Sequence, residues 1–454
     1  MLSDIPQKRI EPHSRTCAEA VVRLLKSALI DRQAADRSLA ALARENRQLG
    51  SRDRRIISET LFAVLRWWGW LRHLVPESFA TAVQTHQPLQ EELNSEDFYA
   101  ALAASWLLDG RTELPPSTRW WMEHAGVRTT ELVAPGPKSE IHERRRCLRA
   151  FFAKEDALPP MAITDLIPNW AMQEASPPYD WSVLVDWLQA RPPVWMRAQT
   201  NDLDRVIGQL ADAGVKVQRH ERLKHAIKAH FIGVNLRTLP LYRDGYLEVQ
   251  DVGSQAVAHV CAPKAGEQWW DCCAGAGGKT LHLSWLMGGK GTILATDSRV
   301  YKLEDLKKRA RRAARSNIRC KEWLGIDVPR YHGIFHGVLV DAPCTCSGTW
   351  RRNPDARWTT KPEDLDELAA LQTTLLNNAS VGVASGGTLV YATCSMFQRE
   401  NQAIVTQFLA THPDFALTPF DSPLTGKPCD GMLQIWPWDS DCDSMFIARM
   451  TRRA

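Results

Sequence analysis

The chain contains 454 residues, of which 44% are hydrophobic and 24% charged, and its formal net charge at pH 7 is +4. Because a single hydrophobic core rarely extends beyond roughly 250–300 residues, this length predicts more than one domain. The composition excludes collagen-like, low-complexity and wholly disordered chains. The weakly basic net charge hints at an acidic partner, and the 18 tryptophans raise the question whether some of their rings stack on a ligand.

The first residues, Met1 to Arg9, lack the apolar core of a secretory signal peptide. No stretch of the sequence reaches the roughly 18–20 apolar residues of a membrane span. We therefore expect a cytoplasmic protein without a membrane partner. Its eleven cysteines are expected to be reduced thiols, because several crowd together in a chain that has no secretory address.

Apolar residues at three-to-four spacing predict helices from 14 to about 74 and again over 98–108. Nothing in this part alternates as a strand would, so residues 1–130 are predicted to form an all-helical domain. Three tryptophans of the second helical segment could form an RNA-stacking surface, but their place on an apolar helix face favours the core. They are Trp67, Trp68 and Trp70.

Residues 131–160 are predicted to be a linker, because glycine and proline interrupt the helical pattern and a basic run follows at 144–146. That run is interpreted as solvated or as touching RNA. A small α/β module is predicted over 161–245, with a strand at 193–197 and a helix at 202–213. Gly214 then stops the helix, and a further strand is expected to begin at 215–217.

From 246 to 454 the sequence predicts an α/β domain with a doubly wound parallel sheet, because β-like apolar runs alternate with long helical stretches. The runs lie at 269–270, 292–295, 337–340 and 388–391.

The glycine-rich segment 273–280 is expected to follow the first of these strands and to enter a helix near Lys279. A phosphate-binding P-loop would need glycine at Cys273, and a dinucleotide fingerprint would need glycine at Thr280, so both motifs fail. S-adenosylmethionine remains, because small residues let backbone amides approach a nucleoside. In that interpretation Asp297, at the end of the second strand, accepts hydrogen bonds from ribose, and Asp327, after a third strand, meets the adenine amino group.

Two thiols and one carboxylate are expected at the carboxyl ends of two later strands: Asp341 and Cys344 after one, and Cys394 after the next. Carbon 5 of cytosine becomes nucleophilic when a thiolate adds to carbon 6, and the hydrogen on carbon 5 must later be removed. This chemistry gives two thiols and an acid separate tasks. It leaves open whether Cys344 or Cys394 is the nucleophile.

At these positions the chain resembles the RsmB/Nop2/Sun family of RNA cytosine-5 methyltransferases. The matching stretches are 249–255, 271–280, 341–344, 351–355, 393–395 and 443–448. The resemblance implies a class I methyltransferase, Rossmann-like fold in which Cys394 attacks carbon 6, Cys344 assists product release and Asp341 hydrogen-bonds the cytosine. It also implies that S-adenosylmethionine is held by Cys273, Ala274, Gly275, Ala276, Gly277, Gly278, Lys279, Asp297, Asp327 and Asp341. The preceding parts resemble the family's NusB-like helical domain and RRM-like subdomain.

One departure from the family pattern is Cys346, which stands where glycine or serine is expected. A Cys-x-Cys pair with His332 and His336 nearby could indicate zinc, but no second thiol pair has metal spacing, so no metal is predicted.

Contacts with RNA are predicted for a basic helix after Asp297 and for a segment after Cys344 in which arginines alternate with indoles. The candidate residues are Lys308, Arg312, Trp350, Arg351, Arg352 and Trp358. The target base must be flipped or single-stranded, because a pocket thiol does not reach carbon 6 within a stacked helix.

The sequence thus predicts a monomeric enzyme that methylates carbon 5 of a cytosine in RNA, with ribosomal RNA favoured over transfer RNA by the helical domain. A non-catalytic RNA-binding ribosome-assembly factor is the alternative from another class, and the two thiols with Asp341 argue against it. An N- or O-methyltransferase would have no need of paired thiols.

Overall fold

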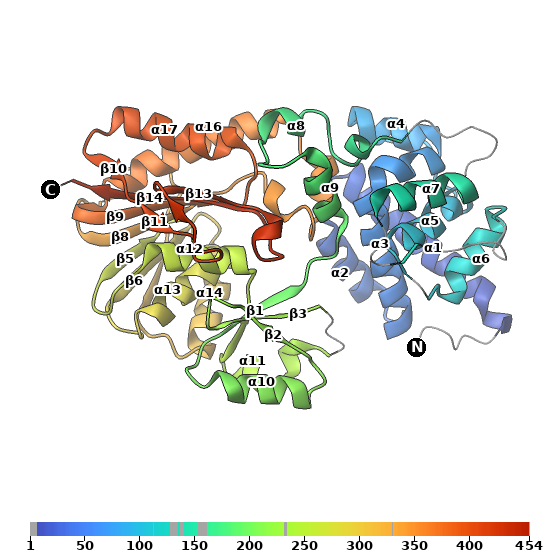
Figure 1. Ribbon diagram of the computed structural model, residues 1–454. Helices are drawn as coiled ribbons and strands as arrows, with labels where there is room; N and C mark the ends of the chain where they lie inside the picture. Colours follow the sequence, from blue (N-terminus) through green and yellow to red (C-terminus); the bar gives the residue numbers. More distant parts are fainter. Residues whose placement is uncertain are drawn as a thin grey trace. The chain divides into compact units, whose positions relative to one another are not determined.

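The computed structural model describes residues 7–111, 113–127, 135–136, 140–152, 161–230, 234–328 and 330–453. The chain divides into two compact units (Figure 1). The helical unit comprises Met1–Gln173, Pro177–Arg191 and Trp350–Thr360, and the α/β unit comprises Glu174–Ser176, Pro192–Thr349 and Lys361–Ala454.

The helical unit confirms the all-helical prediction for the N-terminal part. Its helices are α1 (Gln7–Leu29), α2 (Ala35–Glu45), α3 (Ser51–Leu71), α4 (Glu77–Thr85), α5 (Tyr99–Leu108), α6 (Pro116–His124), α7 (Ile141–Phe152), α9 (Trp181–Gln189) and α15 (Pro354–Thr359), with α8 (Ala171–Glu174) at the border of the two units. Trp67, Trp68 and Trp70 of α3 are buried, as predicted. The indole of Trp70 donates to the carbonyl of Ala162 at 2.8 Å, so it is held inside the core.

Helix α7 lies where the sequence predicted part of a linker, and its basic run is not simply solvated. Arg144 is buried, donates hydrogen bonds to the carbonyls of Leu108 and Gly136, and places its guanidinium over the ring of Trp67. Arg145 donates to the carbonyl of Met161 at 3.2 Å. The rest of the predicted linker, 131–134, 137–139 and 153–160, lies outside the described residues.

A small antiparallel sheet of order β2-β3-β1-β4 opens the α/β unit. Its elements are β1 (Val194–Ala198), α10 (Leu203–Asp212), β2 (Gln218–Arg219), β3 (Ala226–Ala229), α11 (Pro240–Arg243) and β4 (Leu247–Val249). The strand expected to begin at 215–217 begins instead at Gln218, as β2. Val215 is buried, and its amide donates to the carbonyl of Leu210, so this segment closes the end of α10 rather than pairing in the sheet. The sheet also extends past residue 245, where the module was predicted to end.

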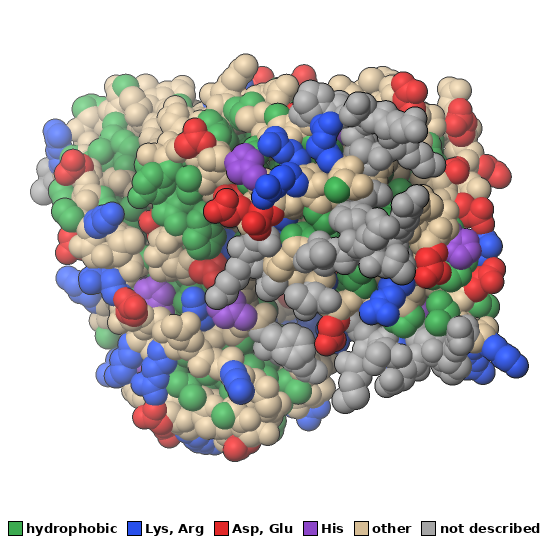
Figure 2. Space-filling view, turned by 45° about the vertical axis from the view of Figure 1, so that its right-hand side comes forward, with side chains coloured by type: hydrophobic (Ala, Val, Ile, Leu, Met, Phe, Trp, Pro, Cys, Tyr) green, Lys and Arg blue, Asp and Glu red, His purple; other side chains and the backbone are tan. Residues whose placement is uncertain are grey.

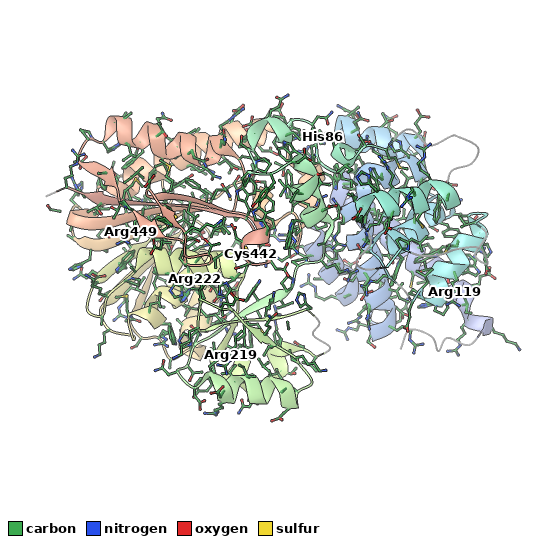
Figure 3. The ribbon with its side chains drawn as sticks, in the orientation of Figure 1. His86, Arg119, Arg219, Arg222, Cys442 and Arg449 are labelled. Atoms are coloured by element: carbon green, nitrogen blue, oxygen red, sulfur yellow. The ribbon has the colours of Figure 1, made fainter. Side chains whose placement is uncertain are left out.

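The large sheet has the order β10-β14-β9-β8-β5-β6-β7, with β13 paired to β14. Its strands are β5 (Gln268–Asp271), β6 (Thr292–Asp297), β7 (Ile318–Glu322), β8 (Phe335–Asp341), β9 (Val383–Thr393), β10 (Phe415–Leu417), β13 (Met432–Ile435) and β14 (Met445–Arg452). Strands β7, β6, β5, β8 and β9 are parallel, whereas β14 runs antiparallel. Cys442 lies just before β14 and Arg449 within it (Figure 3). A separate ribbon pairs β11 (Phe420–Asp421) with β12 (Pro428–Cys429).

Helices cover both faces of this sheet, as the prediction of a doubly wound fold requires. They are α12 (Val252–Cys261), α13 (Gly278–Leu286), α14 (Val300–Arg312), α16 (Pro362–Ser380) and α17 (Gln402–Thr411). Neighbouring residues of one strand enter different cores: Trp269 packs with residues of α12, whereas Trp270 packs with residues of α16 and α17. This alternation explains why the strands read as continuous apolar runs.

The strand order reverses beside β5. The chain places β6 and β7 on one side of β5 and then returns to place β8 on the other side. In open sheets of this kind, ligands bind outside the carboxyl ends of the strands at such a reversal. No helix among the described residues combines the length and apolarity needed to cross a membrane.

Candidate active site

The loop after β5 is shaped by two glycines with left-handed backbone. Gly275 has φ of 52° and Gly277 has φ of 84°. A Cβ atom at Gly277 would overlap the side chain of Leu306 on α14, so only glycine fits that position. Helix α13 begins at Gly278, close to the predicted start at Lys279. Arg309 donates to the carbonyl of Ala276 at 2.6 Å and so holds the loop against α14.

Asp297 ends β6, as predicted, and is held against the glycine loop. Its carboxylate accepts hydrogen bonds from the amide of Gly275 at 2.8 Å and from the amide and guanidinium of Arg299, both at 2.9 Å. Burial opposes ionisation, but these hydrogen bonds outweigh it and lower the pKa of Asp297. An ionised acceptor therefore lies beside the loop, as a ribose site requires. Arg299 was missed in the sequence, although a cation two positions after the acid was the available signal.

Asp271 ends β5 and is almost completely buried, at 1% exposed. One carboxyl oxygen accepts a hydrogen bond from Thr280 Oγ1 at 2.6 Å, and the other has no partner among the described residues. Burial raises the pKa of Asp271 to about 7, although the hydrogen bond from Thr280 acts in the opposite direction. An orphaned carboxyl oxygen beside a glycine cradle fits a cationic nucleoside cofactor such as S-adenosylmethionine. The sequence had indicated Asp271 only as a strand end.

Lys279 and Asp341 form an ion pair between the start of α13 and the end of β8. The ammonium and carboxylate lie 2.7 Å apart. Burial opposes the charge of Lys279, but the carboxylate of Asp341 outweighs it and raises the pKa of the ammonium. Burial also raises the pKa of Asp341, although Lys279 opposes this shift. Both residues were predicted for the site, and the structure brings them together.

The two predicted thiols also meet: Cys344 Sγ and Cys394 Sγ lie 3.4 Å apart. The loops that carry them are joined by a hydrogen bond from the amide of Gly348 to the carbonyl of Cys394 at 2.9 Å. Cys346 adds a third thiol, and all three sulfur atoms lie within 4.8 Å of one another. Hydrogen bonding within this cluster lowers the pKa of Cys346 and raises that of Cys344, so the cluster favours a single thiolate.

The backbone of Cys346 is left-handed, with φ of 57°. A non-glycine residue in this region costs about 1–2 kcal/mol. The Cys346 thiol donates a hydrogen bond to the carbonyl of Cys344 at 3.4 Å.

Glu400 was missed by the sequence analysis, and its buried carboxylate connects both thiol loops. It accepts hydrogen bonds from Thr345, at the amide (2.8 Å) and hydroxyl (2.6 Å), and from the hydroxyl of Ser395. Gln372 donates to it from α16 at 3.0 Å. Since Thr345 follows Cys344 and Ser395 follows Cys394, one carboxylate fixes the two loops.

The other predicted binding residues differ in their surroundings. Strand β7 ends at Glu322, so Asp327 follows only after a loop and is exposed, and its contact with adenine stays a prediction. Trp350 and Arg351 are buried in the helical unit, at 0% and 1% exposed, which contradicts their prediction as RNA-stacking residues. Trp358 belongs to the same unit and donates its indole N–H to the carbonyl of Leu65 at 2.7 Å. Arg352 is exposed, and its RNA contact stays a prediction.

The basic residues of α14 are of two kinds: some form ion pairs with a buried carboxylate, and others are exposed. Arg312 and Arg309 both pair with the buried carboxylate of Glu248 on β4, so Arg312 is corrected to a residue that joins the small sheet to the large one. Lys308 is 73% exposed and lies 3.7 Å from the carboxylate of Asp305, and its RNA contact stays a prediction. On the face drawn in Figure 2, Lys and Arg side chains stand in small groups with acidic side chains between them.

The chain is similar in sequence to known methyltransferases. A family model described as 16S rRNA methyltransferase RsmB/F matches residues 258–451. The ribosomal RNA small subunit methyltransferase B of Salmonella paratyphi C is 30% identical over 427 residues, covering 89% of this chain and 92% of that protein. The protein of the same name from Citrobacter koseri is 29% identical over the same shares.

Solved structures give the same picture of the fold. The crystal structure of PH0851 aligns over 98% of this chain and 99% of its own, with a TM-score of 0.74 and 25% identity. NSun6 from Pyrococcus horikoshii, solved with SFG, aligns over 60% of this chain and 94% of its own, with a TM-score of 0.53 and 18% identity. The latter likeness concerns the fold alone.

Proposed function

The chain belongs to the RsmB/F family of 16S rRNA methyltransferases, and from that premise we propose that it transfers a methyl group to carbon 5 of a cytosine in ribosomal RNA. The observation that carries the cytosine-5 assignment is the thiol pair of Cys344 and Cys394, whose sulfur atoms lie 3.4 Å apart. Methylation of nitrogen or oxygen has no task for a thiol pair, whereas carbon-5 chemistry uses one thiol as the nucleophile and gives the second a task as the base that removes the hydrogen from carbon 5.

The cofactor of this fold is S-adenosylmethionine, which supplies the methyl group as an electrophile bound to sulfur. The residues that fit it are the Gly275–Gly278 loop and the carboxylates of Asp271 and Asp297, for the reasons given above. Asp327 follows β7 after a loop and is exposed, and its contact with the adenine amino group stays a prediction.

In the proposed reaction, Cys394 releases its proton to solvent and its sulfur bonds to carbon 6 of the cytosine, while charge rises toward ring nitrogen N3. Asp341, held in place by its ion pair with Lys279, forms a hydrogen bond with the cytosine. After carbon 5 gains the methyl group, Cys344, as a thiolate that has released its own proton to solvent, takes the remaining proton from that carbon. The bond between Cys394 and carbon 6 then breaks and releases the thiolate. The hydrogen bond with Cys344 and the positive charge of Lys279 favour the thiolate of Cys394, whereas Cys346 and burial act in the opposite direction and raise its pKa to about 12.

The experiment is incubation of the purified chain with labelled S-adenosylmethionine and unmodified ribosomal RNA, free and in the small subunit, followed by bisulfite mapping of 5-methylcytosine. We expect a labelled cytosine in ribosomal RNA. Label at another atom or in transfer RNA only would contradict the proposal, and a folded protein that binds RNA without transferring label would favour an assembly factor.

The roles of the two thiols are tested by single substitutions. Cys394→Ala should abolish transfer, because no sulfur can add to carbon 6. Cys344→Ala should accumulate a protein–RNA adduct that survives a denaturing gel, because carbon 5 keeps its hydrogen and the thiolate cannot leave. Cys429→Ala, a thiol on β12 away from the loops, should behave as wild type. The reverse pattern would exchange the two roles.

A further inference from the structure

Cys346 has no task in the proposed reaction, yet its thiol lies against both thiols that do. We propose that Cys344, Cys346 and Cys394 together form a binding site for one thiophilic divalent cation, such as Zn²⁺ or Cd²⁺, and that the bound ion blocks methyl transfer. The binding site stands on the geometry of the three thiols alone. Its inhibitory effect rests on the proposed function.

The spacing of the sulfur atoms suits such an ion. With a zinc–sulfur bond of about 2.3 Å and tetrahedral geometry, two ligating sulfur atoms stand roughly 3.8 Å apart. The Cys344 and Cys394 sulfur atoms are 3.4 Å apart, and the whole set fits within 4.8 Å. Ligation therefore needs only small movements of side chains. Three protein ligands leave the fourth position of the ion to water.

The site is held in place before any ion arrives. The left-handed backbone of Cys346 directs its side chain back toward Cys344, and its carbonyl accepts hydrogen bonds from the amide and hydroxyl of Thr349, both at 2.9 Å. Thr345, between the first two cysteines, is fixed by the buried carboxylate of Glu400. A preorganised ligand set loses little freedom when it binds, which favours affinity.

The charge balance also permits the ion. Each thiol releases one proton to solvent as its sulfur bonds to the metal, so three thiolates and a divalent cation leave one negative charge. Lys279 supplies a positive charge that acts on Cys394. Sequence spacing could not reveal this set, because Cys394 comes from another strand than the Cys-x-Cys pair.

A second group of possible metal ligands lies in the helical unit and is the alternative site for a bound cation. It consists of His13, Cys17 and Asp53. His13 Nδ1 and Asp53 Oδ1 are 3.1 Å apart, and only one sulfur is present. The three-thiol cluster is therefore the better soft-metal site.

The test is titration of the reduced, full-length protein with Cd²⁺, followed by the thiolate-to-metal charge-transfer absorption. We expect one ion per chain with the intensity of three thiolates. Cys346→Ser should weaken binding at least about tenfold, as loss of a ligand must exceed the effect of a supporting residue. Cys17→Ser and Cys429→Ser should bind as wild type. Unchanged affinity in Cys346→Ser, or loss in Cys17→Ser, would overturn the proposal.

Inhibition is measured separately, so that the two proposals can fail independently. Zn²⁺ should inhibit methyl transfer by the wild type, and a chelator should reverse this inhibition. Cys346→Ser, compared with its own activity in the absence of metal, should need at least about ten times more Zn²⁺ for the same fractional inhibition. Equal inhibition of both proteins would overturn the blocking effect. If the wild type methylates no RNA at all, the proposed function fails while the Cd²⁺ titration still decides the metal site.

Discussion

Glu400 shows how one buried residue sets the geometry of a site that it need not touch. Its carboxylate has no exposed surface and receives hydrogen bonds from the loops after β8 and β9 and from α16. Burial raises the pKa of Glu400, although its hydrogen bonds from Ser395 and Thr345 act against that shift. Because the donors come from both thiol loops, the distance between the thiols is fixed by a buried network rather than by surface contacts.

Asp271 leads to a prediction about pH. Burial raises its pKa from 3.8 to about 7, so the folded protein keeps a proton that the unfolded chain loses between about pH 4 and 7. The free energy of unfolding should therefore fall as pH rises through this window and level off above it, by at most about 4 kcal/mol from this group. The asparagine of Asp271→Asn cannot ionise. Urea denaturation between about pH 4 and 7 should therefore show a smaller fall of the unfolding free energy with pH than in the wild type.

The control for that prediction is Asp204→Asn on α10, a carboxylate with 88% exposure, which should keep the wild-type pH profile. If Asp271→Asn retained the wild-type slope, the proton held by the folded state would belong to another group.

At the scale of elements, the strands of the large sheet were predictable because both their faces are buried, so that apolar runs such as 292–295 stand out in the sequence. Helix α7 was not predictable, because its arginines suggest a solvated segment although one face of the helix is partly buried. Arg144 lies over the ring of Trp67 and donates a hydrogen bond to the carbonyl of Leu108. In the site, acids and thiols at strand ends were predictable. Glu400 contributes through contacts with the loop after β8 and with α16, which lie far from it in the sequence and which spacing does not show, whereas the contact of Arg299 with Asp297 is local.

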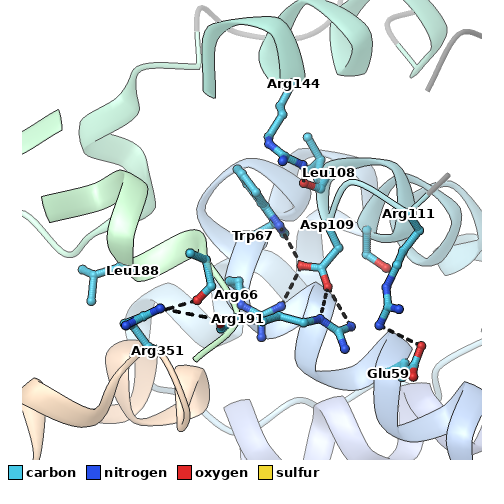
Figure 4. Close-up of polar contacts among 12 residues, drawn as sticks. Glu59, Arg66, Trp67, Leu108, Asp109, Arg111, Arg144, Leu188, Arg191 and Arg351 are labelled. Atoms are coloured by element: carbon cyan, nitrogen blue, oxygen red, sulfur yellow. Dashed lines mark hydrogen bonds and ion pairs between the residues drawn. The ribbon is translucent and has the colours of Figure 1, made fainter. Parts of the chain in front are cut away.

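The polar network around Asp109 also joins segments that lie far apart in the sequence (Figure 4). Asp109 follows α5, and its side chain is only 2% exposed. It accepts hydrogen bonds from Arg66 Nη1 at 2.6 Å, Trp67 Nε1 at 3.2 Å and Arg191 Nε at 2.8 Å. Although burial opposes its charge, the two arginines hold the pKa of Asp109 below its usual value. The carboxylate thus joins α3 to the segment that follows α9.

Asp109→Asn should destabilise the helical unit by about 3–5 kcal/mol, because it leaves the buried guanidinium of Arg66 without a counter-charge. Chemical denaturation followed by circular dichroism measures this loss. The matched control is Glu45→Gln, which removes an ion pair to Arg23 whose partners are 56% and 67% exposed. It should cost less than about 1 kcal/mol. Equal effects of the two substitutions would show that the Asp109 network contributes no more than a surface pair.

At the scale of the whole molecule, the helical unit is not a continuous stretch of sequence. The chain leaves the α/β unit after Thr349, contributes Trp350–Thr360 to the helical unit, and returns at Lys361. This is why Trp350 and Trp358 were misjudged: their closeness to Cys344 in sequence suggested the site, while the chain carries them into another core. Within that core, Asp355 accepts a hydrogen bond from the amide of Ala35 at 3.0 Å.

Arg357 is the residue that most firmly ties this segment into the helical unit. It is completely buried, and its guanidinium donates to the carbonyls of Leu166 at 3.0 Å, Leu188 at 3.1 Å and Arg66 at 3.3 Å. Arg357→Met keeps an apolar stem of similar length but leaves buried carbonyls without donors, each at a cost of about 1–3 kcal/mol.

We therefore expect Arg357→Met to lower the midpoint of thermal unfolding of the full chain and to expose Trp350–Thr360 to limited proteolysis. Arg352→Met, at an exposed position of the same segment, should change the free energy of unfolding by no more than about 0.5 kcal/mol. If Arg357→Met were as stable and as resistant to protease as Arg352→Met, hydrogen bonding by the inserted segment would not stabilise the helical unit. A loss confined to Arg357→Met would instead mean that folding of the N-terminal helices depends on residues that follow Cys344 in sequence.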